Sequence, residues 1–232
     1  MEVLTPFDFI QRFPERKTLA VVGNAPSLKD YRLGEFIDSH DVVVRFNEAA
    51  MTGRAEQIGS RTDILVANPY PESRKRPLLD GGRAGCVLVI NPQTRRGDKD
   101  AFEKWVGDHD VLFTYTPDLV GVGESTHTRG LTTGTYALAL LWRLLHPSRY
   151  FVTGFTMFFE GAPGHYWGSA QPSGLKAHDM VTEAALFIRI LNAAKVPVHV
   201  TPDVEWVSQQ IGVPLLPRVR IVDGQDPQSD GA

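Results

Sequence analysis

Short, mostly apolar runs alternate along this chain with stretches whose apolar residues recur at helical spacing. Runs of this length, bounded by Gly, Pro, Asn or charged residues, are typical of strands buried in a parallel sheet. They predict strands at Leu19–Val22, Val42–Val44, Ile64–Ala67, Cys86–Ile90, Val111–Tyr115, Tyr150–Thr153 and Val198–Val200.

Helical segments are expected between these strands. The spacing of apolar residues predicts helices at Pro6–Arg12, Lys99–Val106, Thr135–Leu145 and Asp179–Ala194, and a helix-length crossover between the first two strands. This alternation predicts an α/β fold: a three-layer α/β/α arrangement with a mostly parallel, Rossmann-like sheet.

The length of 232 residues suits one large domain, which we expect to span residues 1–216. Residues 217–232 are polar and are expected to form a C-terminal tail. Two segments rich in Gly and Pro, residues 70–84 and 156–177, read as long loops. Long loops in a compact domain often close over a ligand, so these two are candidates for acceptor contacts and a lid.

Composition narrows the class of protein. A net charge of −3 gives no support for a nucleic-acid partner. The lone Cys86 excludes an intramolecular disulfide and a cysteine-based metal cluster, and its place in a predicted strand indicates a core thiol. Neither a signal-peptide pattern nor a long apolar run is present, so the sequence predicts no transmembrane segment and a cytoplasmic location.

Two asparagines stand where predicted strands end. Asn24 follows the first strand within a turn opened by Gly23, and Asn47 follows the second. Open α/β sheets bind nucleotides at the carboxyl edge of their strands, so both side chains are candidates for a nucleotide site. Either asparagine alone could equally be a turn residue.

A second candidate for anion binding is the start of the apolar helix near residue 135. Thr132, Thr133 and Gly134 offer hydroxyl and N–H groups that suit a carboxylate or a phosphate, although an ordinary helix cap would use the same residues. The chain contains neither a G-x-x-x-x-G-K-[ST] loop nor a G-x-G-x-x-G turn after the first strand. ATPase and dinucleotide-binding functions therefore lose their main support.

No metal site is expected. The motif Asp108-His109-Asp110 precedes a predicted strand, which places it at the opposite edge of the sheet, and it reads as a solvated turn. His-Glu-x-x-His is absent too. The sequence therefore predicts chemistry without a metal.

Two histidines fall in or beside the second long loop. His165 lies within it, and His178 directly precedes the last long helix. A helix N-terminus disfavours imidazolium, so we expect His178 to be neutral and able to accept a proton near neutral pH. Glu183 is not on the same helical face, so we expect it to hold the loop or cap the helix rather than to contact His178 directly.

Taken together, four segments resemble the motifs of the sialyltransferases of glycosyltransferase family 29. Residues 20–63 resemble the large motif, residues 130–155 the small motif, His165-Tyr166-Trp167 the third motif, and the spacing from His178 to Glu183 the very small motif. The turn GNAPSL is also similar to that of glycosyltransferase family 42, but the His-Tyr-Trp and His-to-Glu patterns favour family 29.

The resemblance implies a GT-A-like variant of the sheet and an inverting, metal-independent transfer of a sialic-acid-type sugar from a CMP-sugar donor to a glycan or glycolipid acceptor. No cofactor beyond this donor substrate is implied. His178 would be the general base and His165 would contact the donor phosphate. Donor binding would fall to Asn24, Asn47, Thr132, Thr133, Gly134 and Gly154.

The chain departs from the family pattern at several positions. Leu19 and Pro147 stand where eukaryotic members have a disulfide, which agrees with a soluble, bacterial-type enzyme. Ala25 replaces the usual Ser, and Thr132-Thr133 replaces Ser-Thr, so a CMP-linked 3-deoxy-octulosonate stays open as the donor.

Two further classes of function remain open. A catalytically silent nucleotide-binding protein would keep the fold, although the intact His178 argues against it. A nicotinamide-dependent oxidoreductase ranks last, since Arg45-Phe46-Asn47 supplies no acidic residue at the end of the second strand.

Overall fold

The computed structural model describes residues 1–14, 16–47, 49–68, 78–80, 83–90, 99–114, 131–159, 165–166 and 178–225. In chain order its helices and strands are β1 (Val3–Leu4), α1 (Pro6–Arg12), β2 (Thr18–Val22), the 3₁₀ helix η1 (Pro26–Asp30), α2 (Gly34–Asp38), β3 (Val42–Phe46), β4 (Ala49–Ala50), α3 (Ala55–Ile58), β5 (Ile64–Ala67), β6 (Leu79–Asp80), β7 (Cys86–Ile90), α4 (Lys99–Val106), β8 (Val111–Thr114), α5 (Thr133–Leu145), β9 (Arg149–Thr153), α6 (Met180–Ala193), β10 (Val198–Val200), α7 (Pro202–Gln210) and β11 (Val219–Ile221).

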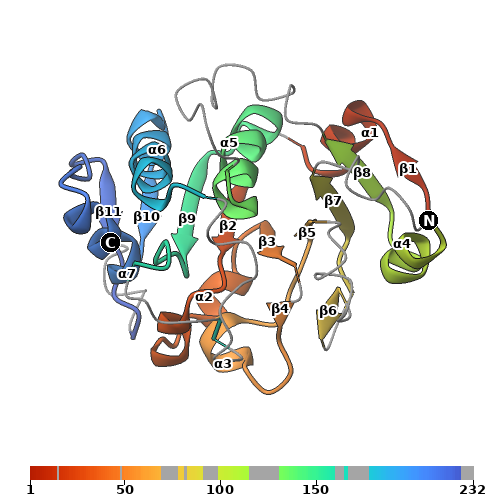
Figure 1. Ribbon diagram of the computed structural model, residues 1–232, viewed down its shortest axis with the longest axis horizontal. Helices are drawn as coiled ribbons and strands as arrows, with labels where there is room; N and C mark the ends of the chain where they lie inside the picture. The colour runs from red at the N-terminus through yellow and green to blue at the C-terminus, as the bar shows by residue number, and fades with distance from the viewer. Residues whose placement is uncertain are drawn as a thin grey trace.

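A parallel sheet forms the centre of the molecule (Figure 1). Among the described residues it has nine strands in the order β1-β8-β7-β5-β3-β2-β9-β10-β11, and every neighbouring pair is parallel. All residues of β3, β5 and β7 are buried, as expected for parallel strands that are covered on both faces. The predicted α/β fold with a Rossmann-like parallel sheet is confirmed.

Helices cover both faces of this sheet (Figure 1). On one face α1, α5 and α6 pack in a single apolar cluster, which includes Phe9, Leu141 and Phe187. On the other face η1, α2 and α3 form a second cluster that includes Leu28, Ile37 and Ile58, while α4 forms a third with Phe102 and Val106. The result is the expected three-layer arrangement.

The seven predicted strands and four predicted helices are present, with shifts of one or two residues at some ends. Tyr115, expected to close its strand, lies outside the described residues. The helix-length crossover after β2 was only partly right. It consists of η1 and the short α2, because Pro26 begins one turn of helix and the chain at Tyr31 returns to an extended conformation.

The C-terminal part of the chain departs most from the sequence-based picture. Val198–Val200 is not the final strand: α7 follows it, and β11 then pairs in parallel with β10, with Val219 opposite Val198. The sheet therefore extends past the expected domain boundary at residue 216 into the segment predicted to be a tail. In β11 only Val219 is buried. The strand was missed in the sequence because an edge strand is largely exposed and lacks the continuous apolar run that predicts a buried strand.

Most of the two expected loops lies outside the described residues, as do residues 116–129. Within residues 70–84, however, Leu79–Asp80 forms strand β6, which pairs with β4 in a separate two-stranded sheet. Within residues 156–177, residues 156–159 and 165–166 are described. Neither the lid nor the acceptor role is tested by these residues.

The strand order reverses between β2 and β9. From β2 the chain builds outward through β3, β5, β7 and β8, then crosses back through α5 to add β9, β10 and β11 on the other side of β2. In open parallel sheets, the crevice at the carboxyl ends of the two strands that flank such a reversal is where ligands bind. The topology thus directs attention to the turns after β2 and β9.

Candidate functional site

The turns that follow β2 and β9 pack backbone against backbone. Gly23 donates its N–H to the carbonyl of Thr153 at 2.8 Å, and Ala25 donates to the carbonyl of Gly154 at 2.9 Å. A Cβ atom on Gly23 would lie 2.2 Å from the Gly154 oxygen, and Gly154 itself has a φ of 76°. Only glycine permits this approach and this conformation, so the two turns form one rigid floor.

Asn24 and Asn47 lie at this edge, and each holds a neighbouring strand end. The Nδ2 group of Asn24 donates to the carbonyl of Phe46 at 3.0 Å, and Oδ1 of Asn47 accepts the N–H of Asn68 at 3.0 Å. The remaining Oδ1 atom of Asn24 is buried and has no hydrogen-bond partner among the described residues. A buried amide oxygen without a partner is uncommon and is available to a ligand donor.

Residues 165 and 166 come back to this turn from far along the chain. The N–H of Tyr166 donates to the carbonyl of Asn24 at 3.1 Å, and the Tyr166 side chain is buried. His165 directly precedes Tyr166 in the chain and therefore lies close to Asn24, in the turn that follows β2. Its ring packs edge-on against Phe158 at 6.4 Å between centroids.

The N-terminus of α5 is occupied by a carboxylate from α6. Glu183 accepts the N–H of Thr132 at 3.0 and 3.1 Å on its two oxygens and also accepts the hydroxyl groups of Thr132 and Thr135, the latter at 2.7 Å. The N–H and hydroxyl of Thr132 thus already bond a carboxylate of the chain itself. Glu183 supplies the anion that a helix N-terminus attracts, whereas no described hydrogen bond engages the N–H groups of Thr133 and Gly134.

His178 lies beside the same carboxylate. Its Nδ1 atom is 3.8 Å from Oε2 of Glu183, and its side chain keeps one quarter of its surface exposed. The expectation that Glu183 would not contact this histidine directly was wrong. Helical spacing does not apply to the pair, because α6 begins after Asp179, whose side chain caps the helix, and His178 precedes that cap.

Phe155 connects the two halves of the site. A Cβ atom on Gly134 would lie 2.7 Å from the Phe155 ring, so the start of α5 touches the residue after Gly154. The same ring packs at 5.8 Å from Phe46 and at 5.0 Å from Phe187, between centroids. One aromatic residue thus contacts the end of β3, the start of α5 and a residue of α6. Neither Phe155 nor its role was predicted.

Asp203 is a further residue that the sequence reasoning missed. It lies near the start of α7 and is 7% exposed, and burial raises the pKa of its carboxyl. One oxygen, Oδ2, accepts the hydroxyl of Ser27 at 2.7 Å and the N–H of Gly154 at 3.0 Å. The run Thr201-Pro202-Asp203 after a strand, a helix cap followed by Pro, was the signal that could have revealed α7 and this residue.

The described residues contain no cluster of three or more His, Cys, Asp or Glu side chains that could hold a metal ion. The Asp108-His109-Asp110 motif precedes β8, and Asp110 forms an ion pair with Arg12 at 2.9 Å and accepts the N–H of Glu2 at 3.2 Å. It is thus at the amino edge of the sheet, as predicted. Among the described helices, none has the length and apolar character needed to cross a membrane.

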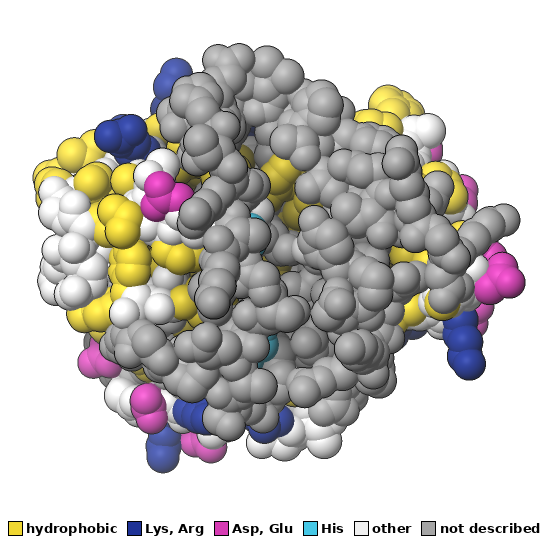
Figure 2. Space-filling model, in the orientation of Figure 1, with side chains coloured by type: hydrophobic (Ala, Val, Ile, Leu, Met, Phe, Trp, Pro, Cys, Tyr) yellow, Lys and Arg dark blue, Asp and Glu magenta, His cyan; other side chains and the backbone are white. Residues whose placement is uncertain are grey.

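Figure 2 shows histidine side chains near the middle of the face seen in Figure 1. The candidate site combines histidines, asparagines and helix N–H groups at the point where the strand order reverses. In an α/β protein with a parallel sheet, such groups at this point suit an anionic, nucleotide-like ligand.

Comparison with known proteins finds similarity to sialyltransferases. Residues 11–82 match the family model described as glycosyltransferase family 29 (sialyltransferase). Type 2 lactosamine alpha-2,3-sialyltransferase of Homo sapiens is 26% identical over 230 aligned residues, which cover 85% of this chain and 68% of that protein. A shorter match of 70 residues is 50% identical to CMP-N-acetylneuraminate-beta-galactosamide-alpha-2,3-sialyltransferase 1 of Mus musculus, covering 30% of this chain and 19% of that protein.

The fold has a counterpart among solved structures. A mammalian sialyltransferase in complex with Gal-beta-1-3GalNAc-ortho-nitrophenol superposes with a TM-score of 0.62 at 22% identity, covering 84% of this chain and 73% of that one. The chain is similar to the sialyltransferases of glycosyltransferase family 29, as its motifs indicated. The roles expected for the individual site residues stay predictions.

Proposed function

We propose that this protein is a metal-independent, inverting sialyltransferase that moves a sialic-acid-type sugar from a CMP-sugar to an acceptor hydroxyl. The observation that carries the proposal is that all eight predicted site residues (Asn24, Asn47, Thr132, Thr133, Gly134, Gly154, His165 and His178) belong to segments connected by described contacts at the sheet reversal. The match of residues 11–82 to the family 29 model supports the donor class.

On the donor side, the floor made by the β2 and β9 turns would take the nucleotide. Asn24 Oδ1 would accept a donor group of CMP, and the N–H groups of Thr133 and Gly134 would bind an anionic group of the CMP-sugar. His165, beside Asn24, would face the phosphate. These groups stabilise the charge that develops on the phosphate as CMP leaves.

On the acceptor side, His178 would act as the general base. It would take the proton of the acceptor hydroxyl while the oxygen bonds to the anomeric carbon and the bond from that carbon to the CMP phosphate breaks. The Glu183 carboxylate, 3.8 Å from Nδ1, would orient the ring and stabilise the imidazolium that forms. Because the leaving phosphate would be neutralised by His165 and N–H groups, no metal is required in this proposal.

The experiment is to measure CMP release from CMP-sialic acid in EDTA, with and without a panel of glycan acceptors. We expect acceptor-stimulated release that falls by about 10²–10⁴ in His178→Asn, the contribution of a positioned base. His146→Asn is the matched control. It makes the same change in an exposed histidine at the far end of α5, where the left-handed backbone tolerates Asn.

Three results would contradict parts of the proposal. Release that is lost in EDTA and restored by a divalent cation would overturn metal independence. Equal activity of His178→Asn and the wild type would remove His178 as the base. If CMP binds but CMP-sialic acid is not turned over, a CMP-linked octulosonate is the next donor, and failure with both would leave a nucleotide-binding protein.

The cytoplasmic location also stays a proposal. Fractionating cells of the source organism and measuring the transferase activity in each fraction would test it. Activity confined to the membrane or an extracytoplasmic fraction would exclude it.

A further inference from the structure

Asp203 connects α7 to both turns of the candidate site. Its carboxylate receives four hydrogen bonds from described residues, two on each oxygen. Oδ1 accepts the Thr201 hydroxyl and the N–H of Val204, which are groups of its own helix start. Oδ2 accepts the Ser27 hydroxyl at 2.7 Å and the Gly154 N–H at 3.0 Å, which belong to the turns after β2 and β9.

Gly154 is held on both sides of its Cα atom. Oδ2 of Asp203 accepts the N–H of Gly154, which belongs to the peptide that joins Thr153 to Gly154, while the Gly154 carbonyl, in the next peptide, accepts the N–H of Ala25 at 2.9 Å. Gly154 has a φ of 76°, in the left-handed region, and these two hydrogen bonds fix the otherwise permissive backbone of a glycine there. Since Ala25 directly follows Asn24, the orientation of the Asn24 turn depends on how Gly154 is held.

Starting a helix does not by itself require this arrangement. An exposed Asp or Ser near a helix start satisfies backbone N–H groups at little cost, whereas burying a carboxylate is costly. None of the four groups that bond the Asp203 carboxylate is a cation. The buried carboxylate is therefore stabilised by neutral donors, and half of these lie in the candidate donor site.

We propose that Asp203 is a positioning residue for donor binding, which acts through Gly154 and Ser27 without touching the donor. This inference rests on the proposed function, because the turns it holds are the proposed nucleotide floor. In chemical terms, the ligand whose binding it controls is the CMP part of the donor.

The test compares the two oxygens of Asp203. Ser27→Ala removes a donor from Oδ2, on the site side, and Thr201→Val removes one from Oδ1, on the helix side, with little change of shape. We expect Ser27→Ala and Asp203→Ala to raise the KM for CMP-sialic acid by about tenfold with kcat changed little, as for the loss of uniform binding. Thr201→Val also removes the 2.9 Å contact of its hydroxyl with that of Thr153, which precedes Gly154. It should lower the urea midpoint and raise this KM less than Ser27→Ala does.

Two further variants sharpen the result. Ser208→Ala removes a buried hydroxyl that bonds within α7 alone, so it reports on the stability of that helix without reaching the site. In the double variant Ser27→Ala/Asp203→Ala, the two effects should not multiply, because Ser27 acts through Asp203. Multiplying effects would mean that Ser27 contacts the donor itself, and would contradict the proposal.

The binding of CMP, measured by calorimetry, separates this inference from the proposed function. Weaker CMP binding in Asp203→Ala supports the inference even if CMP-sialic acid is never turned over, an outcome that would refute the proposed transferase. A donor KM and a CMP affinity within about twofold of wild type in Ser27→Ala and Asp203→Ala would overturn the inference. If Asp203→Ala does not fold, Ser27→Ala alone decides.

Discussion

Glu183 shows how one buried side chain can serve two segments that the sequence keeps about 50 residues apart. It is 2% exposed, bonds the start of α5 through Thr132 and Thr135, and lies against His178. The helix N-terminus stabilises its charge, and the charge in turn faces the histidine. The very small motif therefore pairs a proposed base with the residue that fixes the first turn of α5.

Replacing Glu183 with Gln should impair both stability and catalysis. The amide would present its NH₂ group to donors, leaving buried groups unpaired at a cost of about 1–3 kcal/mol in the free energy of unfolding. We also expect kcat to fall by up to about 100-fold, because a misplaced catalytic group loses that much. Urea unfolding and initial rates measure the two effects, with the exposed Glu35→Gln as control. Unchanged kcat in a destabilised variant would limit Glu183 to a structural role.

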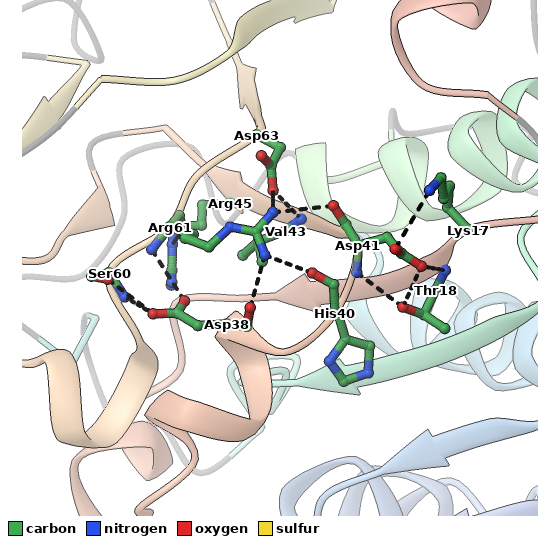
Figure 3. A network of polar contacts seen from close by, with 10 residues as sticks. All are labelled: Lys17, Thr18, Asp38, His40, Asp41, Val43, Arg45, Ser60, Arg61 and Asp63. Atoms are coloured by element: carbon green, nitrogen blue, oxygen red, sulfur yellow. Dashed lines mark hydrogen bonds and ion pairs between the residues drawn. The ribbon is translucent and has the colours of Figure 1, made fainter.

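Charged side chains connect the amino ends of strands β2, β3 and β5 to one another and to α2 (Figure 3). The guanidinium of Arg61 donates to the carbonyls of Asp38 and His40 at 2.7 and 2.8 Å, which satisfies backbone groups at the end of α2. It also bonds the Asp63 carboxylate at 3.0 Å. This network lies at the opposite edge from the candidate site, so its contribution is to stability.

The contribution of Asp41 to the stability of this edge depends on pH. Its carboxylate accepts the N–H and hydroxyl of Thr18 at 2.8 and 2.9 Å, and these bonds, with Lys17 nearby, lower its pKa below the ordinary 3.8. The folded state thus binds this proton more weakly than the unfolded state. The stabilisation is fully present above the unfolded pKa and is lost as the pH falls through the lower folded value.

We therefore expect Asp41→Asn to lower the free energy of unfolding at pH 7 by about 0.5–1 kcal/mol, a small value because the side chain is partly solvent-screened. The difference between variant and wild type should shrink as the pH is lowered through the acidic range. Urea unfolding at a series of pH values measures it. The control is Asp30→Asn, which removes an exposed charge elsewhere on the surface. A difference that is constant with pH would contradict the assignment.

For the molecule as a whole, the C-terminal segment completes the sheet. Strand β11 covers one edge of β10, and Val219 and Val222 are buried at 7% and 2% exposure. Arg32 further donates its N–H to the carbonyl of Gly224 at 2.7 Å, which ties this segment back to the region before α2. The segment that composition identified as a tail is therefore part of the folded sheet, and its Val219 belongs to the same apolar cluster as Val204 and Val207 of α7.

Truncation after Leu216 should consequently destabilise the protein. Removing β11 and Val222 exposes apolar surface worth about 1.5–3 kcal/mol for each buried valine, against a typical total of about 5–15 kcal/mol. Truncation after Gln225 is the control, because it removes only residues beyond the described part of the chain. Thermal unfolding and soluble yield measure the outcome. If both truncated proteins were equally stable, residues 217–225 would not contribute to the fold, and the predicted domain boundary at residue 216 would be correct.

The sequence determined what depends on local pattern. Apolar runs such as Val42–Val44 and Cys86–Ile90 predict buried parallel strands, because a strand that is covered on both faces has few polar positions. The motif residues Asn24, Asn47, His165 and His178 could be picked out because they follow or flank such elements. The resemblance to glycosyltransferase family 29 could be found on the same basis, since each motif is contiguous in the chain.

Only the tertiary structure decided which groups meet. Glu183 reaches Thr132 because α6 packs against α5, and Asp203 reaches Ser27 and Gly154 because β9 lies next to β2 in the sheet. Strand β11 was hidden for a related reason: an edge strand is half solvated, so its composition resembles that of a polar tail. Hydrogen bonds between residues distant in the chain leave no periodic signal in the sequence, because packing rather than spacing brings their partners together.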